Sequence, residues 1–500
     1  MIVGKDGQIC CRPTTDTFRK ELDSLQNTFR KVVGPEELVI DVPLVLEPAQ
    51  WPDCCIYRVP KKLREVNQEA YTPKLISIGP LHHGKYELCA MEMMKLRYLR
   101  GFCYRTGKCQ KDLSSFIEEN ELKIRHCYAE TFDISSEDFV KMVLLDSTFI
   151  IELFLRFAES DGLFRCTAAC GECDSDTSGE DGCNAIGKYE QDRISSQPIM
   201  KKHILQDLIL LENQLPFFIL DELHTQFSKS EQNKCISFLK LARKYLVPPK
   251  EKTSIDKKKV KHFTDLMRYV YRPSKPGDRA KAENIYNAKK LDEAMILKKA
   301  EEGKLLDINF RKGKPFPWLS CSWLLCCFPC LESIKCLENT QTVLEVPCFE
   351  ARGETEGLFR NLMALEQCHY PYEAYICDYF VLLDNLINTR EDVEFLVEKG
   401  IIVNALGSHK AVAVMVNKLG LEIDQEQKSC YAKLTEDVNR YYKKRWNRNL
   451  GALRTIYFRD IWRGTATLVG VIVLLVTILN FLKPFIFTKC KFFHCDITNN

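Results

Sequence analysis

Two adjacent histidines, His82 and His83, are the strongest candidates for acid–base or metal chemistry among the nine histidines of the chain. They follow Gly79 and Pro80, a pair that favours a turn, and an imidazole at a turn is suited to act as a general base or a metal ligand. The simpler interpretation is that one imidazole hydrogen-bonds to backbone within the turn. The carboxylates that would complete a catalytic site are Asp146, Glu212 and Glu366.

Glu212 and Glu366 each lie in a phrase that combines apolar residues at helical spacing with side-chain amides, residues 208–218 and 361–367. Polar residues beside a helix break usually cross-link segments by bonding to backbone, and Pro216 predicts such a break. We therefore interpret both phrases as structural. The alternative is a paired-carboxylate site made by Glu212 and Glu366.

Three aspartates are candidate buried acids with shifted pKa values: Asp146, on the apolar face of a helix predicted over 139–154, together with Asp207 and Asp265. The alternative is that each is the satisfied partner of an arginine or of backbone amides.

Known catalytic and nucleotide-binding devices are absent from the sequence. There is no G-x-S-x-G, no Walker phosphate loop, no G-x-G-x-x-G and no H-E-x-x-H. The formal net charge of +3 argues against a general polyanion-binding surface. We therefore expect no cofactor, no resident metal and no nucleic-acid partner, and the absence of motifs favours a function other than catalysis.

The 24 cysteines include two clusters. Cys166, Cys170, Cys173 and Cys183 lie in an acidic Gly/Ser-rich stretch, which is typical of a disordered insertion; a zinc site is the alternative. The second cluster lies among aromatic and apolar residues between 316 and 336, where Cys327 and Cys330 have the spacing of a redox dithiol but lack a βαβ context. Acylation of Cys326 and Cys327 is a further interpretation, and it would add a membrane contact.

An uncharged run, Gly464–Leu482, lies near the C-terminus. As a helix it would span roughly 28 Å, close to the thickness of a bilayer core. Basic residues dominate its N-terminal side, so the positive-inside rule places the N-terminal bulk in the cytosol. Ala466 and Gly470 form a small-xxx-small pair that permits helix pairing, which leaves a homo-oligomer open.

The segment before this run interleaves basic and aromatic residues, a pattern typical of an interfacial helix on anionic headgroups. Lipid is therefore a better interpretation of this segment than nucleic acid. The residues that we expect at the membrane interface are Lys443, Lys444, Arg445, Arg448, Arg454, Arg459, Trp462 and Arg463.

The chain reads as mainly α, a multi-helix body with a few short strands and one transmembrane helix. Thr389 with Asp392 resembles a capping box, and Ser408 predicts another helix start. Short β-branched pieces at Lys74–Ile78 and Ile401–Val403 predict extended backbone.

The predicted organisation has five parts. They are a helical lead with a Pro-rich connection (1–53), a helical domain (54–435), a basic juxtamembrane segment (436–463), the transmembrane helix (464–482) and a short non-cytosolic tail (483–500). Within the helical domain we expect a disordered insertion at about 160–195, a charged linker at 248–261 and an apolar Cys-rich insertion at 313–341. The sequence leaves open whether 54–247 and 262–435 share one core.

Several phrases are specific enough to indicate a family. They include Ser77-Ile78-Gly79-Pro80-Leu81-His82-His83-Gly84, Leu211-Glu212-Asn213-Gln214-Leu215-Pro216-Phe217-Phe218, and His262-Phe263-Thr264-Asp265-Leu266. In these the chain resembles the plant domain-of-unknown-function 247 family over about 54–482. The resemblance implies a helical cytosolic domain on a C-terminal membrane helix, and it implies no established chemistry. Some grass members of the family are linked to pollen-side recognition in self-incompatibility.

Two functions follow as expectations. The first is a tail-anchored membrane protein whose cytosolic helical domain recognises a protein partner, in signalling or recognition. The second is a membrane-associated hydrolase or transferase that uses His82 or His83 with a carboxylate. The second requires a histidine and a carboxylate within hydrogen-bond reach in a concave pocket.

Overall fold

The computed structural model describes residues 51–162, 193–227, 236–248, 259–313, 341–423, 428–444 and 461–495. Several predicted features therefore lie outside the described residues. They are the helical lead before residue 51, the zinc or disorder alternatives at Cys166–Cys183, most of the charged linker, the acylation candidates Cys326 and Cys327, and the interface residues Arg445, Arg448, Arg454 and Arg459.

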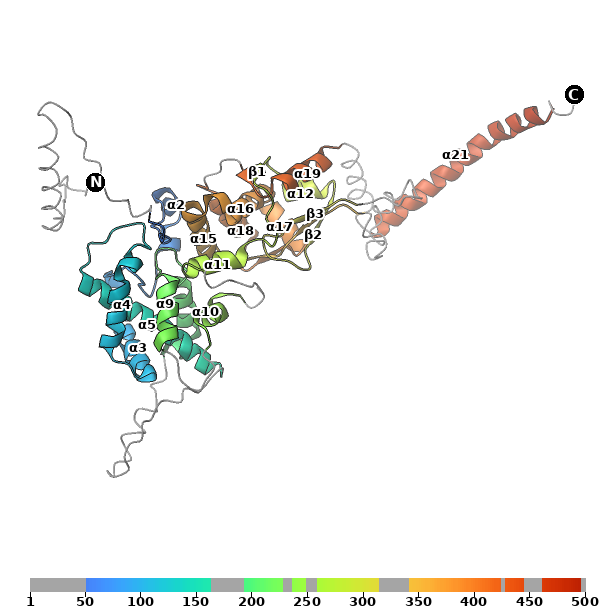
Figure 1. Ribbon diagram of the computed structural model, residues 1–500. Helices are drawn as coiled ribbons and strands as arrows, with labels where there is room; N and C mark the ends of the chain where they lie inside the picture. The colour runs from blue at the N-terminus through green and yellow to red at the C-terminus, as the bar shows by residue number, and fades with distance from the viewer. Residues whose placement is uncertain are drawn as a thin grey trace, which may run out of the picture. The chain divides into compact units, whose positions relative to one another are not determined.

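The first half of the body is built around one long helix, α5 (Ser136–Ser160). Ser135 caps its N-terminus by accepting a hydrogen bond from the backbone N–H of Asp138. α5 is apolar over most of its circumference because other helices pack against several of its sides (Figure 1). These helices are α3 (Ala90–Thr106), α4 (Gln110–Arg125), α9 (Phe217–Phe227) and α10 (Phe238–Leu246).

Short elements complete this half. They are α2 (Lys61–Val66), the 3₁₀ turns η2 (Gln68–Tyr71) and η3 (Tyr86–Leu88), α7 (Arg193–Ser196) and α8 (Pro198–Asp207). Residues 208–216 connect α8 to α9 without regular structure.

The second half combines helices with short strands. Its helices are α11 (Phe263–Tyr271), α12 (Ala288–Asp292), α15 (Thr355–His369), η6 (Pro371–Glu373), α16 (Tyr375–Leu386), α17 (Arg390–Glu398), α18 (His409–Leu419) and α19 (Ala432–Lys443). Its strands are β1 (Ala280–Lys281), β2 (Ile296–Lys299), β3 (Asn309–Arg311), β4 (Val343–Val346), β5 (Phe349–Ala351), β6 (Ile402–Asn404) and β7 (Lys428–Ser429).

Each described sheet is small. The three-stranded sheet has the order β2-β4-β3, with β2 parallel and β3 antiparallel to β4. β5 pairs with β6 in parallel, and β1 pairs with β7 in antiparallel. The prediction of a mainly α protein with few short strands is therefore confirmed.

One hydrophobic core joins the two halves. A continuous cluster of buried side chains runs from Cys55 and Phe154 in the first half to Phe263, Phe380 and Tyr442 in the second. This answers the question that the sequence left open: the two halves share one core.

The helix caps that the sequence predicts from residues a few positions apart are present in the structure. Thr389 and Asp392 form a capping box at the start of α17. Gly400, with φ of +70°, follows the helix, and Ser408 caps α18 through the N–H of Ala411. The extended piece predicted near Ile401–Val403 is β6.

The piece at Lys74–Ile78, for which the sequence predicts extended backbone, belongs to no β-strand of the structure. Instead the Asp207 carboxylate accepts the backbone N–H groups of Lys74, Leu75 and Ile76, at 2.7 to 3.1 Å. A side chain distant in sequence therefore replaces a neighbouring strand as the hydrogen-bond acceptor.

Two expected boundaries fall inside packed structure. α19 buries Val438, Asn439 and Tyr442 against the body, so residues up to Lys443 belong to the helical domain rather than to a juxtamembrane segment beginning at 436. Lys443 itself contacts Glu283 at 3.2 Å. Val260, at the end of the expected linker, is also buried in the core.

The C-terminal helix is α21 (Ile461–Cys495). It contains a stretch, Thr465–Lys483, that is long and apolar enough to cross a membrane. Trp462 and Arg463 lie in its first turn. The helix continues through the first part of the tail expected at 483–500.

Candidate functional site

Glu212 is the centre of the most connected group of candidate residues. It lies in the α8–α9 connection, and its side chain is almost fully buried. Oε1 accepts the backbone N–H of Val59 at 2.7 Å and is bound by the guanidinium of Arg64 from α2. Oε2 lies 3.2 Å from Nε2 of His82. Of the predicted histidine–carboxylate pairs, the structure therefore brings His82 and Glu212 together.

Burial and hydrogen bonding have opposite effects on the ionisation of this pair. Burial lowers the pKa of His82 and outweighs the nearby Glu212 carboxylate, so the imidazole is neutral at pH 7. Nδ1 lies 2.7 Å from the Lys85 ammonium, which can only donate. The remaining proton is therefore on Nε2, the ring nitrogen that lies near Oε2 of Glu212. Burial also opposes ionisation of Glu212, but bonds from His82 and Arg64 outweigh it and lower the pKa of the carboxyl.

Asp146 belongs to a second buried group. Its carboxylate lies 2.5 Å from the Lys95 ammonium of α3 and accepts the backbone N–H of Gly79 at 2.8 Å. Lys95 also donates to the carbonyl of Ser77 at 2.6 Å and to Glu92 at 2.6 Å. This group fixes the turn at Gly79 against α3 and α5. His83, on the same turn, is exposed.

Glu366 forms a third group, on α15. It accepts the backbone N–H groups of Ile376 and Cys377 at 2.8 and 3.0 Å, and Nε of Arg268 lies 3.2 Å away. Burial raises the pKa of Glu366 to about 7. Among the described residues, Glu212 and Glu366 share no hydrogen-bonding partner, so these contacts give no support to the paired-carboxylate alternative.

The other acids also bond to backbone or aromatic partners. Asp265 accepts the N–H of Lys261 at 2.9 Å and the hydroxyl of Tyr370 at 2.9 Å. Burial raises the pKa of Asp265 to about 6. Burial likewise raises the pKa of Asp207, which accepts the three N–H groups described above.

Amide side chains in the same phrases tie distant segments together. Asn213 accepts the N–H of Ile78 at 2.7 Å, and Gln214 accepts the N–H of Phe263 at 2.9 Å. Asn361 accepts the N–H of Leu211 at 2.9 Å and donates to the carbonyl of Ala70 at 2.7 Å. The amides therefore act as the cross-links that the sequence indicates.

The cations that pair with these buried acids are what sequence reasoning missed. Arg64, Lys95 and Arg268 neutralise Glu212, Asp146 and Glu366, but each lies far along the chain from its partner. No local spacing marks these residues as partners, because the pairing depends on the tertiary fold.

Chemically, these groups are suited to holding the chain rather than to transforming a substrate. His82 is 2% exposed and Glu212 is 1% exposed, and none of the described pockets is lined by either residue. Within the described residues, no group of histidine, cysteine and acidic side chains could hold a metal ion.

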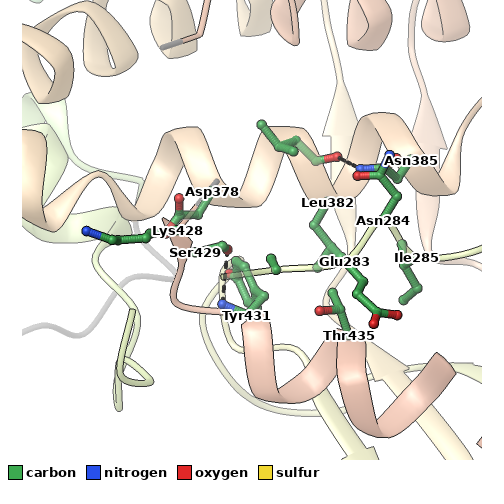
Figure 2. Close-up of a pocket in the computed structure, with 12 residues that line it drawn as sticks. Glu283, Asn284, Ile285, Asp378, Leu382, Asn385, Lys428, Ser429, Tyr431 and Thr435 are labelled. Atoms are coloured by element: carbon green, nitrogen blue, oxygen red, sulfur yellow. Dashed lines mark hydrogen bonds between the residues drawn. The ribbon is translucent and has the colours of Figure 1, made fainter. Parts of the chain in front are cut away.

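A polar cleft of about 380 Å³ lies elsewhere, between α16, the 282–285 segment and the start of α19 (Figure 2). It is lined by Ala282, Glu283, Asn284, Ile285, Asp378, Val381, Leu382, Asn385, Lys428, Ser429, Tyr431 and Thr435. Its buried acid, Asp378, binds Arg279 at 2.9 Å and the N–H of Cys430 at 2.9 Å. The cleft contains none of the histidines or carboxylates predicted from the sequence.

The phrases that hold these cross-links also decide the family. Residues 56–476 match DUF247, described as a plant protein of unknown function. The chain belongs to this family. The match covers both halves of the body and extends into α21.

Two curated relatives come from Arabidopsis thaliana. The chain is 28% identical to UPF0481 protein At3g47200 over 474 residues, 87% of each protein. It is 25% identical to Putative UPF0481 protein At3g02645 over 496 residues, which covers 84% of the chain and 88% of the relative. No solved structure matches the chain.

Proposed function

We propose that this member of the domain-of-unknown-function 247 family is a single-pass, tail-anchored membrane protein whose helical body lies in the cytosol and recognises a protein partner. The observation that carries the proposal is the apolar stretch Thr465–Lys483 in α21, at the opposite end of the chain from the body's buried polar groups. A stretch of this length matches the core of a bilayer.

Charge supports the orientation. Basic residues concentrate before the stretch, including Lys443, Lys444 and Arg463, which places the preceding chain on the cytosolic side by the positive-inside rule.

The geometry of the polar groups supports recognition over catalysis. Each buried acid considered above is engaged with backbone, amide, aromatic or cationic partners of its own chain. Such groups make a rigid scaffold, and a rigid scaffold presents a binding surface with little ordering cost.

Membrane topology is tested with epitope tags at both ends of the full-length protein in isolated membranes. We expect the N-terminal tag to be digested by added protease, the C-terminal tag to be protected, and the protein to resist carbonate extraction. A matched variant lacking 464–482 should appear in the soluble fraction. Extraction of the full-length protein by carbonate would overturn the anchor, and glycosylation of the body would overturn its cytosolic orientation.

Recognition is tested by proximity labelling from the N-terminus of the full-length protein in plant cells. The control is the same labelling enzyme fused to the 461–495 helix alone. Proteins labelled by this control are general membrane neighbours and are set aside. Reproducible cytosolic proteins specific to the full chain support the proposal, and an identical labelling pattern for the two contradicts it.

A membrane-associated hydrolase or transferase is the second candidate, favoured by the 3.2 Å approach of His82 to Glu212. It requires His82 to become accessible. Diethyl pyrocarbonate should modify exposed His83 rapidly and buried His82 at least about tenfold more slowly. Equal rates for the two would show an open histidine site and favour the enzyme.

A further inference from the structure

The outer face of α3 combines apolar and basic side chains that the body leaves uncovered. Tyr86, in η3 just before the helix, is 86% exposed, Met93 is 66% exposed, and Leu96 and Tyr104 are 46% and 49% exposed. Arg97 and Arg100 are exposed as well. At 100° per residue, the five positions from Met93 to Tyr104 fall within about 100° of the helix circumference.

The opposite face of α3 is fixed. Lys95 binds Asp146, Tyr98 packs on Phe149 with ring centroids 4.8 Å apart, and Arg105 binds Glu152 at 2.8 Å. All of these partners lie on α5, beside which α3 lies in Figure 1. The exposed face is therefore held in place by the core and needs no ordering before it binds.

The two arginines give this face its charge. Among the described residues, neither Arg97 nor Arg100 forms an ion pair, whereas Arg58, Arg105 and Arg125 do. A guanidinium presents a planar fork that matches a carboxylate. Arginine, tyrosine and methionine are also the side chains enriched at protein interfaces.

We propose that the Met93–Tyr104 face of α3 is the docking surface for an amphipathic helix of a partner protein, one that carries apolar residues flanked by glutamates or aspartates. This inference rests on the proposed recognition function and names the surface and the partner's chemistry. Met93, Leu96 and Tyr104 contact the apolar side of the partner, and Arg97 and Arg100 pair with its carboxylates.

Charge placement distinguishes this partner from a lipid surface. A helix that lies on a membrane keeps its cations at the edges of the apolar strip, where they reach the headgroups. Here Arg100 lies inside the strip, about 20° from Met93 on the side of Leu96, whereas Arg97 lies at the edge of the strip, about 40° from Met93 on the other side. A central cation such as Arg100 is stabilised by a carboxylate that arrives with the partner.

The test places a photo-crosslinking benzoylphenylalanine at Leu96 of the full-length protein in membranes supplied with plant cytosol. Matched crosslinking positions are Leu122 on α4 and Val414 on α18, which are also exposed apolar sites. We expect the Leu96 adduct to map to an acidic amphipathic segment of another protein. The double variant R97E/R100E should reduce that adduct about tenfold, and replacing two of the partner's acids with arginine should restore it.

The control for charge is K289E/K290E, which makes the same change in net charge on exposed residues of α12 and should leave the adduct unchanged. Adducts at Leu96 with lipid, with residues 163–192 of the same chain or with a second copy would overturn the inference, as would insensitivity to R97E/R100E. If protein adducts form only at Leu122 or Val414, the α3 inference fails and the recognition function stands. If none forms at any of the three positions, the α3 inference fails, and the proximity-labelling comparison alone decides the recognition function.

Discussion

At the scale of single residues, the buried charges of this protein act through long-range bonds. Glu212 holds Val59 and Arg64, from the start of the body around α2, and His82, from the turn at 79–84. Removing a buried carboxylate with such partners lowers the free energy of unfolding strongly. The reason is that the donors it bound are then buried without a hydrogen-bond acceptor.

Replacing Glu212 with alanine should therefore lower the free energy of unfolding by about 3 to 5 kcal/mol. The matched variant is Glu130→Ala, which breaks the exposed Arg58–Glu130 pair and should cost at most about 1 kcal/mol. Urea denaturation of the full-length protein in detergent, followed by far-ultraviolet circular dichroism, measures both. Equal effects would show that Glu212 is not a structural link.

The buried carboxyl of Asp265 should make the stability of the fold depend on pH. Its folded-state pKa of about 6 exceeds the ordinary value of 3.8 because of burial, so the folded protein holds the proton more tightly than the unfolded chain. The stabilisation is complete below about pH 4 and is lost as the pH rises to about 6. That difference in pKa corresponds to roughly 3 kcal/mol. Asp265→Asn should remove this part of the pH dependence.

The contrasting control is Asp161, which is mostly exposed and whose pKa is lowered chiefly by its bond to Lys244. Asp161→Asn should give a smaller effect of the opposite sign, because a depressed carboxyl pKa stabilises the fold at higher pH. Denaturation curves collected between about pH 4 and 7 test both variants. A wild-type curve parallel to that of Asp265→Asn would exclude the burial effect.

At the scale of elements, the turn at Gly79 shows why glycine is needed where the 77–84 phrase meets the core. Gly79 has φ of +70°, and a Cβ added there would lie 2.5 Å from the carbonyl oxygen of Gln214 and 2.9 Å from the hydroxyl of Tyr128. Gly84 has φ of +75° with open space around it. The two glycines share backbone strain but differ in packing.

Gly84→Ala should therefore lower the free energy of unfolding by about 1 to 2 kcal/mol, because alanine is disfavoured in the left-handed conformation. Gly79→Ala should lower the free energy of unfolding by an additional ~1 to 3 kcal/mol, because Gln214 or Tyr128 must move. Thermal or urea denaturation of the two single variants measures the difference. Equal losses would mean that the turn relaxes without disturbing the core.

What the sequence predicts at this scale depends on distance along the chain. The capping pair Thr389–Asp392 and the cap at Ser408 bond within three residues, so local patterns identify them. The sequence predicts extended backbone at Lys74–Ile78 from its β-branched residues, but it does not reveal Asp207, which accepts the backbone N–H groups of this segment. Strands β2 and β4 were not predicted, since they are four residues long and separated by more than forty residues.

The candidate site follows the same rule. Sequence patterns identified the buried acids and amides, because polar residues in apolar helical phrases are unusual. They did not identify Arg64, Lys95 or Arg268, which lie in ordinary helical surroundings. The sequence offers three carboxylates as partners of His82 or His83, and only the fold shows that Glu212 is the neighbour of His82.

At the scale of the whole molecule, the described body should behave as one cooperative unit. The buried cluster spans both halves, and several bonds cross between them: Lys261 accepts the N–H of Phe217 at 2.7 Å, His262 contacts the carbonyl of Cys55 at 3.0 Å, and Asn361 accepts the N–H of Leu211. Most of these bonds connect positions on either side of residues 249–258.

A protease site inserted between residues 249 and 258 of the full-length protein therefore tests this unity. After cleavage, the two fragments should stay associated in detergent during size-exclusion chromatography, and they should separate only in denaturant. The reason is that core contacts and buried bonds, not the connecting peptide, hold the halves together; loss of that connection costs mainly chain entropy. A second destabilising change, Glu212→Ala, should make the cleaved halves separate at lower urea concentration, whereas Glu130→Ala should not. Fragments that part under native conditions would show two independently folded domains instead of one core.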